Sequence, residues 1–192
     1  MQVSSEFESD ILDIIKSRRS RRAFLGKSIE AEKIKSLFEA ARWAPSSVNE
    51  QPWAYVYGTK DQTELWNKIF DALNEGNKIW AKDAPLLVVS LARKYYTNND
   101  RLNNSAKYDV GAANAFLSLQ ATQLGLNVHQ MGGFDHTILQ QNLNVPEVFD
   151  IGVVMAIGYA GESTQLPIAL RERELSPRMR HLQNEFVMNH PF

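Results

Sequence analysis

The sequence contains no cysteine, and this absence excludes disulfide bonds, thiolate metal sites, iron–sulfur clusters and cysteine nucleophiles. It also lacks an excess of charge of either sign, because 21 lysines and arginines stand against 22 aspartates and glutamates, for a formal net charge of -1. A nucleic acid partner held by bulk positive charge is therefore disfavoured, and any anion site must be a local one.

Long hydrophobic runs are absent as well. The longest aliphatic runs, Leu86 to Val89 and Val153 to Ile157, fall far short of the ~18–20 residues that a membrane span needs. The N-terminal stretch MQVSSEFESDILDI has no basic n-region and no continuous apolar segment, so it does not read as a signal peptide. Together with the missing cysteines, which suit a reducing compartment, these features predict a cytoplasmic protein with no membrane partner.

Several motifs of known chemistry are also missing. The four histidines show no HExxH spacing and no neighbouring set of carboxylates, so we expect them to be scattered over the surface and to bind no metal: His129, His136, His181 and His190. No GxSxG motif marks a serine nucleophile, and no GxGxxG motif marks a Rossmann dinucleotide site.

The residues that are present are those of an ordinary folded chain. Its 192 residues, 44% hydrophobic and 22% charged, are typical of one globular domain, which we expect to span residues 1–192. Helical periodicity predicts helices over residues 6–18, 34–44, 61–74, 105–124 and 135–143. Alternating or fully apolar runs predict strands over residues 53–57, 85–91, 128–131 and 151–159. Helices that alternate with four short strands indicate an α/β or α+β sheet covered by helices.

Some boundaries rest on particular residues. Thr59 and Gln62 form a plausible capping box for the helix that begins at Asp61, and Glu75-Gly76-Asn77 should break that helix. The polar segment from Arg93 to Asn104 follows neither period, and we expect a mobile surface loop that could act as a lid. The helix from Ser105 to Leu124 is apolar nearly all round, so one small domain would hardly bury it, and we expect an oligomer.

A basic cluster stands near the N-terminus. Between Lys16 and Lys27 there are six basic residues and no acidic one: Lys16, Arg18, Arg19, Arg21, Arg22 and Lys27. Taken alone, such a cluster is more often a solvated helix end that complements the helix dipole. Its arginines and Ser20 also offer forked donors and a hydroxyl, which suit one phosphate group. Arg178 and Arg180 form a second pair, whose spacing in an extended tail would point both side chains to the same side.

Two loops contain residues that suit a ligand. The segment PSSVNEQPW, from Pro45 to Trp53, is denser in hydroxyl and amide side chains than a connector requires. It is either a helix-to-strand loop whose polar groups satisfy their own backbone or the floor of a site for a polar heterocycle. Gly132 and Gly133 follow a predicted strand, where glycines form a tight turn or let backbone N–H groups approach a ligand.

Three separated segments together resemble the nitroreductase family of FMN-dependent oxidoreductases. Arg18-Arg19-Ser20-Arg21-Arg22 matches the family's basic R-x-S-x-R/K segment, Pro45 to Trp53 matches its P-S-S-x-N-x-Q-P-W loop, and Gly133 to Asp135 matches its G-F-D turn. The match continues through Gly158-Tyr-Ala-Gly161 to the two tail arginines, and it spans residues 11 to about 187 in order.

The resemblance implies an α+β fold in which helices sandwich a mixed sheet, and an intertwined homodimer with two FMN molecules at its interface. Positions that hold the FMN phosphate and ribityl chain are matched by Arg18, Arg19, Ser20, Arg178 and Arg180. Positions around the flavin ring are matched by Arg22 and Asn77 at the pyrimidine edge, by Gly132 and Gly133 near N5, and by Pro45, Ser46, Ser47 and Asn49 in a loop from the partner subunit. The family chemistry requires no catalytic acid or base.

The sequence departs from the larger family members in two respects. It is short and lacks the extra helices that they insert near the long interface helix, and Gly132 stands where many relatives have an acidic residue. Both departures affect the open side of the pocket, so the acceptor substrate is less defined than the cofactor.

The implied function is an FMN-dependent oxidoreductase that uses NAD(P)H as co-substrate. One pocket would serve NAD(P)H and a small-molecule acceptor in turn, by ping-pong hydride transfer, and the acceptor class is nitroaromatics, quinones or related conjugated electrophiles. Two alternatives remain open at this point. One is a flavin-binding protein without turnover, acting as a store or regulator, and the other is a helical interaction module that uses the basic cluster as a docking patch.

Overall fold

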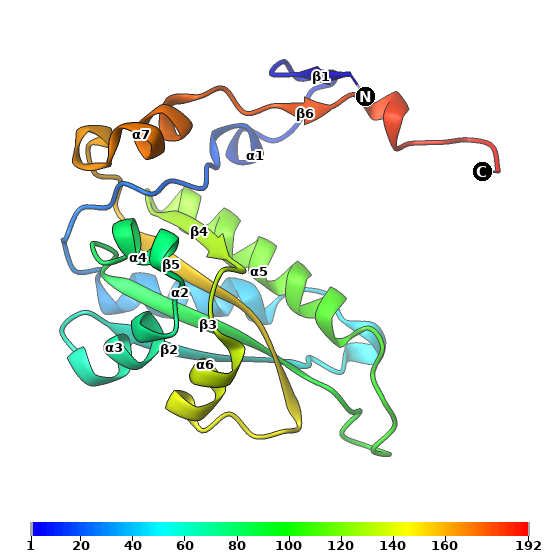
Figure 1. The fold of residues 1–192 in the computed structure, drawn as a ribbon. Helices are drawn as coiled ribbons and strands as arrows, with labels where there is room; N and C mark the ends of the chain where they lie inside the picture. The colour runs from blue at the N-terminus through cyan, green and yellow to red at the C-terminus, as the bar shows by residue number, and fades with distance from the viewer. Residues whose placement is uncertain (1, 192) are drawn as a thin grey trace.

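The computed structural model describes residues 2–191. A four-stranded sheet in the order β2-β3-β5-β4 forms its centre (Figure 1). The strands are β2 (Trp53–Thr59), β3 (Leu86–Arg93), β4 (Asn127–Met131) and β5 (Phe149–Gly158). All three strand pairs are antiparallel, so the mixed pairing expected for the sheet is not found among the described residues of this one chain.

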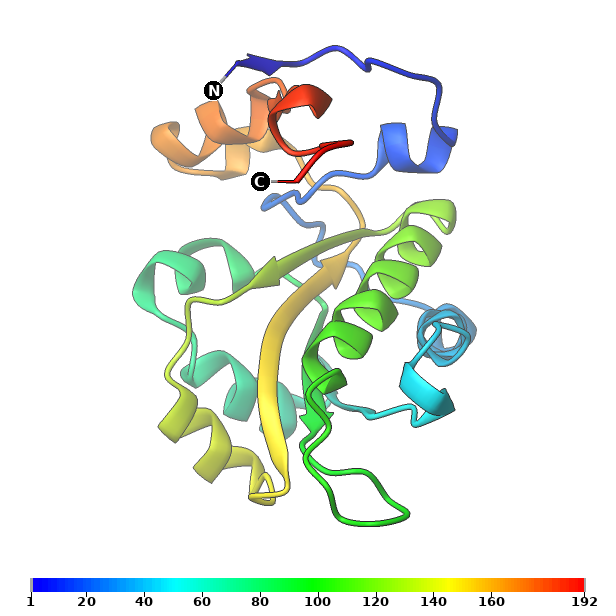
Figure 2. The same cartoon turned by 90° about the vertical axis from the view of Figure 1, so that its right-hand side faces the viewer.

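Helices cover both faces of this sheet. Helices α2 (Ala31–Arg42) and α5 (Ala106–Gln123) lie on one face. Helices α3 (Thr63–Asp71), α4 (Glu75–Ala81) and α6 (His136–Leu143) lie on the other, as Figure 2 shows. The α+β fold class is therefore confirmed.

Strand β3 shows why both faces need cover, as its uniformly apolar sequence predicts. Its side chains alternate between two cores, with Leu86 and Val88 facing α2 and α5, and Leu87 and Val89 facing α3, α4 and α6. All four are fully buried. Burial of each such side chain contributes roughly 1.5–3 kcal/mol, so the sheet and its two helical layers form one cooperative unit.

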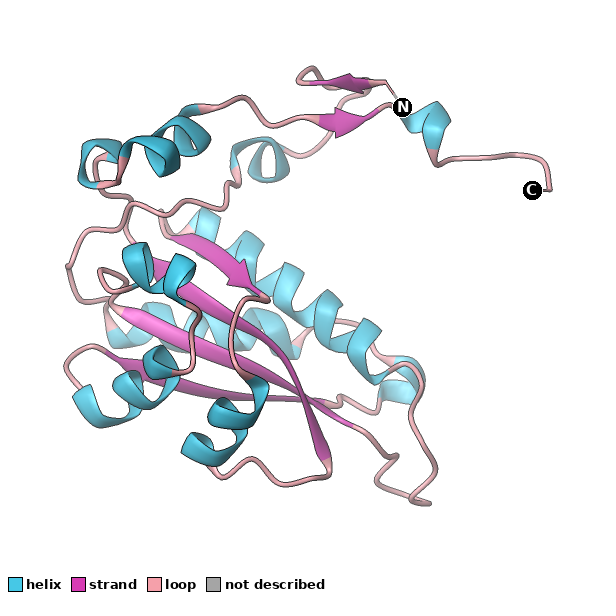
Figure 3. Ribbon diagram, in the orientation of Figure 1, coloured by secondary structure: helices cyan, strands magenta, loops and turns pink. Residues whose placement is uncertain are grey.

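The two ends of the chain form a separate layer over one edge of the sandwich (Figures 1 and 3). Helix α1 (Asp13–Ser17) and helix α7 (Ile168–Leu175) lie in this layer. A two-residue strand β1 (Val3–Ser4) pairs antiparallel with β6 (Arg180–His181). The layer thus brings the N-terminal basic cluster and the tail arginines into one region. Three short 3-10 helices complete the described elements: Ser47–Asn49, Ser163–Gln165 and Gln183–Glu185.

Most predicted elements are confirmed, but the N-terminal helix is much shorter than expected. Residues 6–12 are not helical, and α1 has only five residues, none of them buried. Phe7, Ile11 and Leu12 remain exposed. A helix needs about 12–15 residues or tertiary packing to be stable, and here the apolar stripe has no core to pack against.

The region after β2 also differs from expectation. The Thr59–Gln62 capping box does not form, because Thr59 belongs to β2. Gln62 is the N-cap residue of α3, and its side chain makes no capping hydrogen bond. Glu75-Gly76-Asn77, expected to break a helix, instead begins α4, with the Asn74 side chain accepting a hydrogen bond from the Asn77 N–H at 3.0 Å. Helix α7, in the polar tail, was not predicted either.

Helix α5 is covered on only one side by this chain. Eight of its residues are buried, but Tyr108 is 82% exposed, Phe116 is 41% exposed, and Gly111 and Ala115 between them are exposed too. These residues recur at helical spacing and form one apolar face. No helix within residues 2–191 is both long and apolar enough to cross a membrane.

Candidate functional site

A pocket lined by arginines lies in the terminal layer. Its cavity is about 200 Å³ and is lined by Arg18, Arg19, Ser20, Arg21, Arg173, Glu174, Ser176, Pro177, Arg178 and Arg180. This arginine pocket joins the N-terminal basic cluster to the tail pair, although 160 residues separate Arg18 from Arg178 in the sequence. The structure therefore brings together all five residues that the family pattern places on the FMN phosphate.

Positive charge in the pocket is only partly offset. Burial lowers the pKa of Arg18, and the charges of Arg178, Arg180 and Arg19 lower it further. Burial, followed by the charges of Arg19 and Arg180, lowers the pKa of Arg178 in the same way. An arginine stays charged despite such shifts, so mutual repulsion among these guanidinium groups favours a bound anion.

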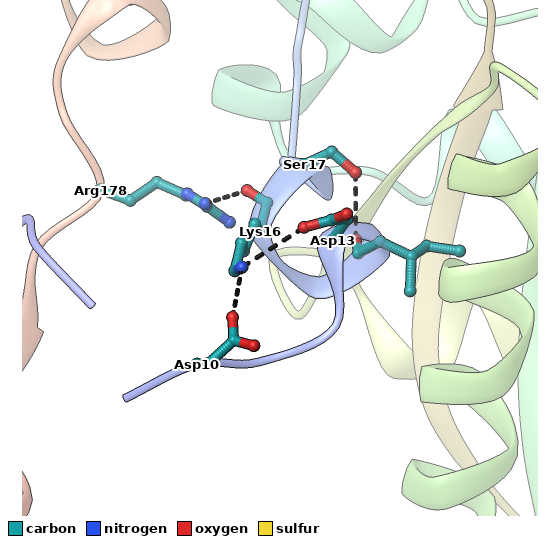
Figure 4. A network of polar contacts seen from close by, with 6 residues as sticks. Asp10, Asp13, Lys16, Ser17 and Arg178 are labelled. Atoms are coloured by element: carbon teal, nitrogen blue, oxygen red, sulfur yellow. Dashed lines mark hydrogen bonds and ion pairs between the residues drawn. The ribbon is translucent and has the colours of Figure 1, made fainter. Parts of the chain in front are cut away.

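The two tail arginines differ in their hydrogen bonds. Arg178 caps the C-terminal end of α1, where its guanidinium donates to the carbonyl oxygens of Arg18 at 2.6 Å, of Ile15 at 3.4 Å, and of Lys16 (Figure 4). Within residues 2–191, the Arg180 guanidinium donates only to the carbonyl of its neighbour Met179, at 2.7 Å. Arg180 is therefore the more available of the two for an external anion, and Arg178 holds α1 against the tail.

A network of side chains fixes the same end of α1. The Lys16 ammonium lies 2.7 Å from an Asp10 oxygen and 3.3 Å from an Asp13 oxygen, and Ser17 donates to the Ile14 carbonyl at 3.2 Å (Figure 4). Lys16 is thus paired with two carboxylates, and it is not among the residues that line the arginine pocket.

A second part of the site is the turn after β4. The Asn77 side chain donates to the Gly133 carbonyl at 2.9 Å, and the Asn74 N–H donates to the same oxygen at 3.1 Å. A Cβ atom at Gly133 would lie 2.9 Å from the Asn77 amide nitrogen and closer still to the Asn74 amide nitrogen, so a side chain there would displace both asparagine side chains. Gly132 has open space around the position of a Cβ atom. The turn is therefore fixed on one side and accessible on the other.

His129 connects this turn to the basic cluster. Its ring lies 4.5 Å from the Trp80 ring, and its Nδ1 lies 3.1 Å from the Arg21 carbonyl oxygen. Burial lowers the pKa of His129 to about 4, and the nearby Arg22 charge adds to this effect. The expectation of a surface histidine was therefore wrong here, because the ring is half-buried and neutral at pH 7, with Nδ1–H donating to the carbonyl.

The loop from Pro45 to Gln51 is held in an unusual backbone shape. The Ser47 N–H donates to a carboxylate oxygen of the buried Asp109 at 3.1 Å, and the Ser46 hydroxyl accepts from the Gln51 N–H at 3.0 Å. Val48, Asn49 and Gln51 all have positive φ angles, of 47°, 57° and 52°. Valine rarely adopts this conformation, which costs about 1–2 kcal/mol, and such strain is concentrated at functional loops.

Both readings of this loop have support. Ser46 does satisfy the loop's own backbone, as a simple connector would require. Within the described residues, however, no hydrogen bond involves the Asn49 side-chain amide, and Pro45 is exposed. The segment expected to be a mobile loop, residues 93–104, packs beside it, with the Thr97 N–H donating to Glu50 at 2.7 Å.

The loop lies far from the arginine pocket in this chain. Ser47 contacts α5 at Asp109, near its N-terminal end, whereas Arg18 and Ser20 line a second cavity with Ala115, Ser118 and Leu119. This interval of the helix corresponds to roughly 14 Å. The two parts lie at different ends of α5 (Figures 1 and 2). One chain thus brings together the basic cluster, the tail arginines, Asn77 and the two glycines in one half of the molecule, but not the loop residues Pro45, Ser46, Ser47 and Asn49.

The second cavity joins the arginine pocket to the uncovered face of α5. It measures about 440 Å³ and is lined by Ile15, Arg18, Ser20, Ala115, Ser118, Leu119, Val128 and Gln130. Arg18 and Ser20 line both hollows. Within residues 2–191, no group of three or more His, Asp or Glu side chains is arranged to hold a metal ion.

Sequence reasoning missed two residues of this region. Glu174 lines the arginine pocket from α7, and His129 lies beneath the basic cluster. Glu174 lies in a polar tail without a strong helical period. His129 lies in β4, and the sequence does not reveal that Trp80 of α4 covers its side of the strand. Only the tertiary arrangement distinguishes them from surface residues.

Known proteins are similar to this chain in sequence and in fold. A model described as the Nitroreductase family matches residues 15–159. A solved structure described as an oxidoreductase containing FMN is 32% identical, covers 97% of this chain and 95% of its own, and has a TM-score of 0.92. A nitroreductase family protein from Clostridium difficile 630 is 23% identical, covers 96% of this chain and 100% of its own, and has a TM-score of 0.74. A Stenotrophomonas maltophilia (strain R551-3) protein, provisionally named NADH dehydrogenase/NAD(P)H nitroreductase, is 22% identical over an alignment of 184 positions, which covers 86% of this chain and 93% of the relative.

Proposed function

The chain belongs to the nitroreductase family, whose model matches residues 15–159, and from this premise we propose that it is an FMN-dependent oxidoreductase that oxidises NAD(P)H and reduces nitroaromatics, quinones or related conjugated electrophiles. The observation that supports this most is the arginine pocket, in which the two basic segments of the family pattern meet. The 32% identical solved relative, which contains FMN, supports the same cofactor.

The residues present fit FMN and its terminal phosphate. A phosphate monoester carries about −1.5 to −2 charges at pH 7, and forked guanidinium donors suit its oxygens. Arg18, Arg19, Ser20 and Arg180 line one pocket of suitable polarity. At the other end, the open space over Gly132 allows close approach of a flat ring to the backbone.

Each part of the site then has a physical task. When bound, FMN supplies the hydride chemistry, accepting a hydride from NAD(P)H and donating it to the acceptor. The arginine pocket would hold the phosphate, and, as the family pattern implies, Arg22 and Asn77 would bind at the pyrimidine edge and the backbone at Gly132 and Gly133 would bind near N5. Neutral His129 adds no further positive charge there. None of these residues acts as a catalytic acid or base, and one pocket serves NAD(P)H and acceptor in turn, which gives ping-pong kinetics.

The test is a cofactor analysis followed by steady-state kinetics. We expect acid extraction to release FMN rather than FAD, and we expect NAD(P)H oxidation with menadione or nitrofurazone to give parallel double-reciprocal lines. Bound FMN without turnover would indicate a flavin store or regulator instead. A protein that binds no flavin after reconstitution would contradict the proposed function and favour an interaction module.

We also propose that two chains form an intertwined homodimer with shared sites. Two observations support this: the uncovered apolar face of α5, and the distance between the arginine pocket and the loop from Pro45 to Gln51, which a second copy would bring to the pocket.

One domain over residues 1–192 is likewise proposed, since both terminal segments form one layer. The cytoplasmic location stays a prediction.

Phe116→Glu should weaken this dimer. The substitution places a charge in the uncovered face of α5 twice per dimer, so we expect the dimer dissociation constant to rise at least about tenfold. Gln123→Glu, on the exposed end of the same helix, is the matched control and should leave it unchanged. Light scattering across a concentration series measures both, and a stable wild-type monomer that binds FMN would contradict the shared site.

Arg180→Ala should weaken binding of FMN but not of riboflavin. Loss of one charge-assisted hydrogen bond to phosphate removes about 1.5–3 kcal/mol, so FMN affinity should fall roughly tenfold to a hundredfold. Riboflavin lacks the phosphate and should bind as before. Arg171→Ala, on α7 but outside the pocket lining, is the control, and flavin fluorescence quenching measures all affinities. Equal losses for the two flavins would remove Arg180 from the phosphate site.

A further inference from the structure

Glu174 is the only acidic residue among those that line the arginine pocket. Its side chain is 2% exposed, which is unusual for a carboxylate because burial of an unpaired charge is costly. A carboxylate beside a bound phosphate also repels it, so this residue opposes by charge the anion that the pocket attracts. Its presence therefore needs a reason other than charge balance.

The contacts of Glu174 supply that reason. One carboxylate oxygen accepts a hydrogen bond from the Arg22 backbone N–H at 2.9 Å, and the other accepts a longer one from the Ala23 N–H at 3.5 Å. The Arg21 guanidinium lies 3.9 Å from the same second oxygen. The buried charge is thus satisfied almost entirely by backbone donors of the basic cluster.

The backbone at the end of α7 extends this attachment. The Arg19 guanidinium donates to the Ser176 carbonyl at 2.7 Å and to the Glu174 carbonyl at 3.5 Å. The next hydrogen bonds along the chain, between Ala23 and Gly161 and between Leu25 and Tyr159, tie the segment to the end of β5. Glu174 and its neighbours therefore hold the stretch between α1 and the sheet, which itself forms neither helix nor strand.

We propose that Glu174 is a positioning residue for the cofactor phosphate: it fixes the backbone of residues 19–23 so that Arg18, Arg19 and Ser20 converge on one anion before FMN binds. This proposal rests on the proposed function. Preorganisation of this kind raises affinity by lowering the ordering cost at binding. It also outweighs the charge repulsion that the carboxylate introduces.

Two substitutions separate position from charge. Glu174→Gln keeps the length of the side chain but removes the charge and one acceptor, whereas Glu174→Asp keeps the charge but shortens the reach to the Arg22 N–H. If Glu174 acts by position on the phosphate site, both variants should bind FMN about tenfold more weakly and should lose much less affinity for riboflavin. If it acts only by charge, Glu174→Gln should bind FMN more tightly and Glu174→Asp should bind it as the wild type does.

The matched control is Glu172→Gln, which removes the same charge from the exposed side of the same helix. It should leave FMN affinity unchanged or slightly raised. Equal loss of FMN and riboflavin in the Glu174 variants would show a general folding defect and overturn the proposal, as would tighter FMN binding in Glu174→Gln.

A second readout does not depend on flavin. Amide hydrogen exchange of the full-length chain without FMN should be faster at Arg22 and Ala23 in both Glu174 variants, and unchanged in Glu172→Gln, because only Glu174 protects these amides. Unchanged exchange would overturn the proposal. A wild-type protein that binds no FMN would instead contradict the proposed function, while the exchange result would still decide whether Glu174 holds the segment.

Discussion

Repulsion among arginine side chains from the two ends of the chain is the constraint on which the site depends. Guanidinium groups of Arg18, Arg19, Arg178 and Arg180 share a small pocket, and burial lowers the pKa of the most enclosed of them. Backbone carbonyls of α1 and α7 accept their hydrogen bonds but do not neutralise them. The pocket therefore suits the phosphate that we propose for it, and one buried carboxylate, Glu174, accepts hydrogen bonds from the backbone of the basic cluster without neutralising the whole cluster.

The sandwich below serves as a rigid support for this pocket. Fully buried residues of β3 connect two cores, and β4 presents His129 and the glycine turn to the basic cluster. The same sandwich leaves one face of α5 uncovered and places the strained loop from Pro45 to Gln51 at its other end. In the homodimer that we propose, a second copy of the chain would satisfy both features at once, by covering α5 and by bringing its own loop to the pocket.

The sequence was most informative where burial of one or both faces of an element sets the spacing of its apolar residues. Strand β3 and helix α5 could be predicted because their side chains pack on one or both faces of a sheet. Prediction failed where local pattern and tertiary packing disagree. The apolar stripe of residues 6–18 forms only α1, since Phe7, Ile11 and Leu12 stay exposed, and Asn74 caps a helix where Gly76 suggested a break. The basic cluster and the tail arginines can be identified as candidates from the sequence. Their meeting, however, involves contacts between the basic cluster and α7, such as those of Glu174, and the polar sequence of α7 gives no period to recognise.

Mixing two defective variants tests the shared site most directly. Arg18→Ala impairs the arginine pocket, and Asn49→Ala impairs the loop, so each variant alone should bind FMN poorly and turn over slowly. In a mixed dimer of the proposed kind, one site would combine an intact pocket with an intact loop, and random pairing should restore about one site in four. We expect FMN binding and NAD(P)H oxidation to recover to this level after joint refolding. Activity of the mixture no greater than the average of the two variants would contradict a site built from two chains.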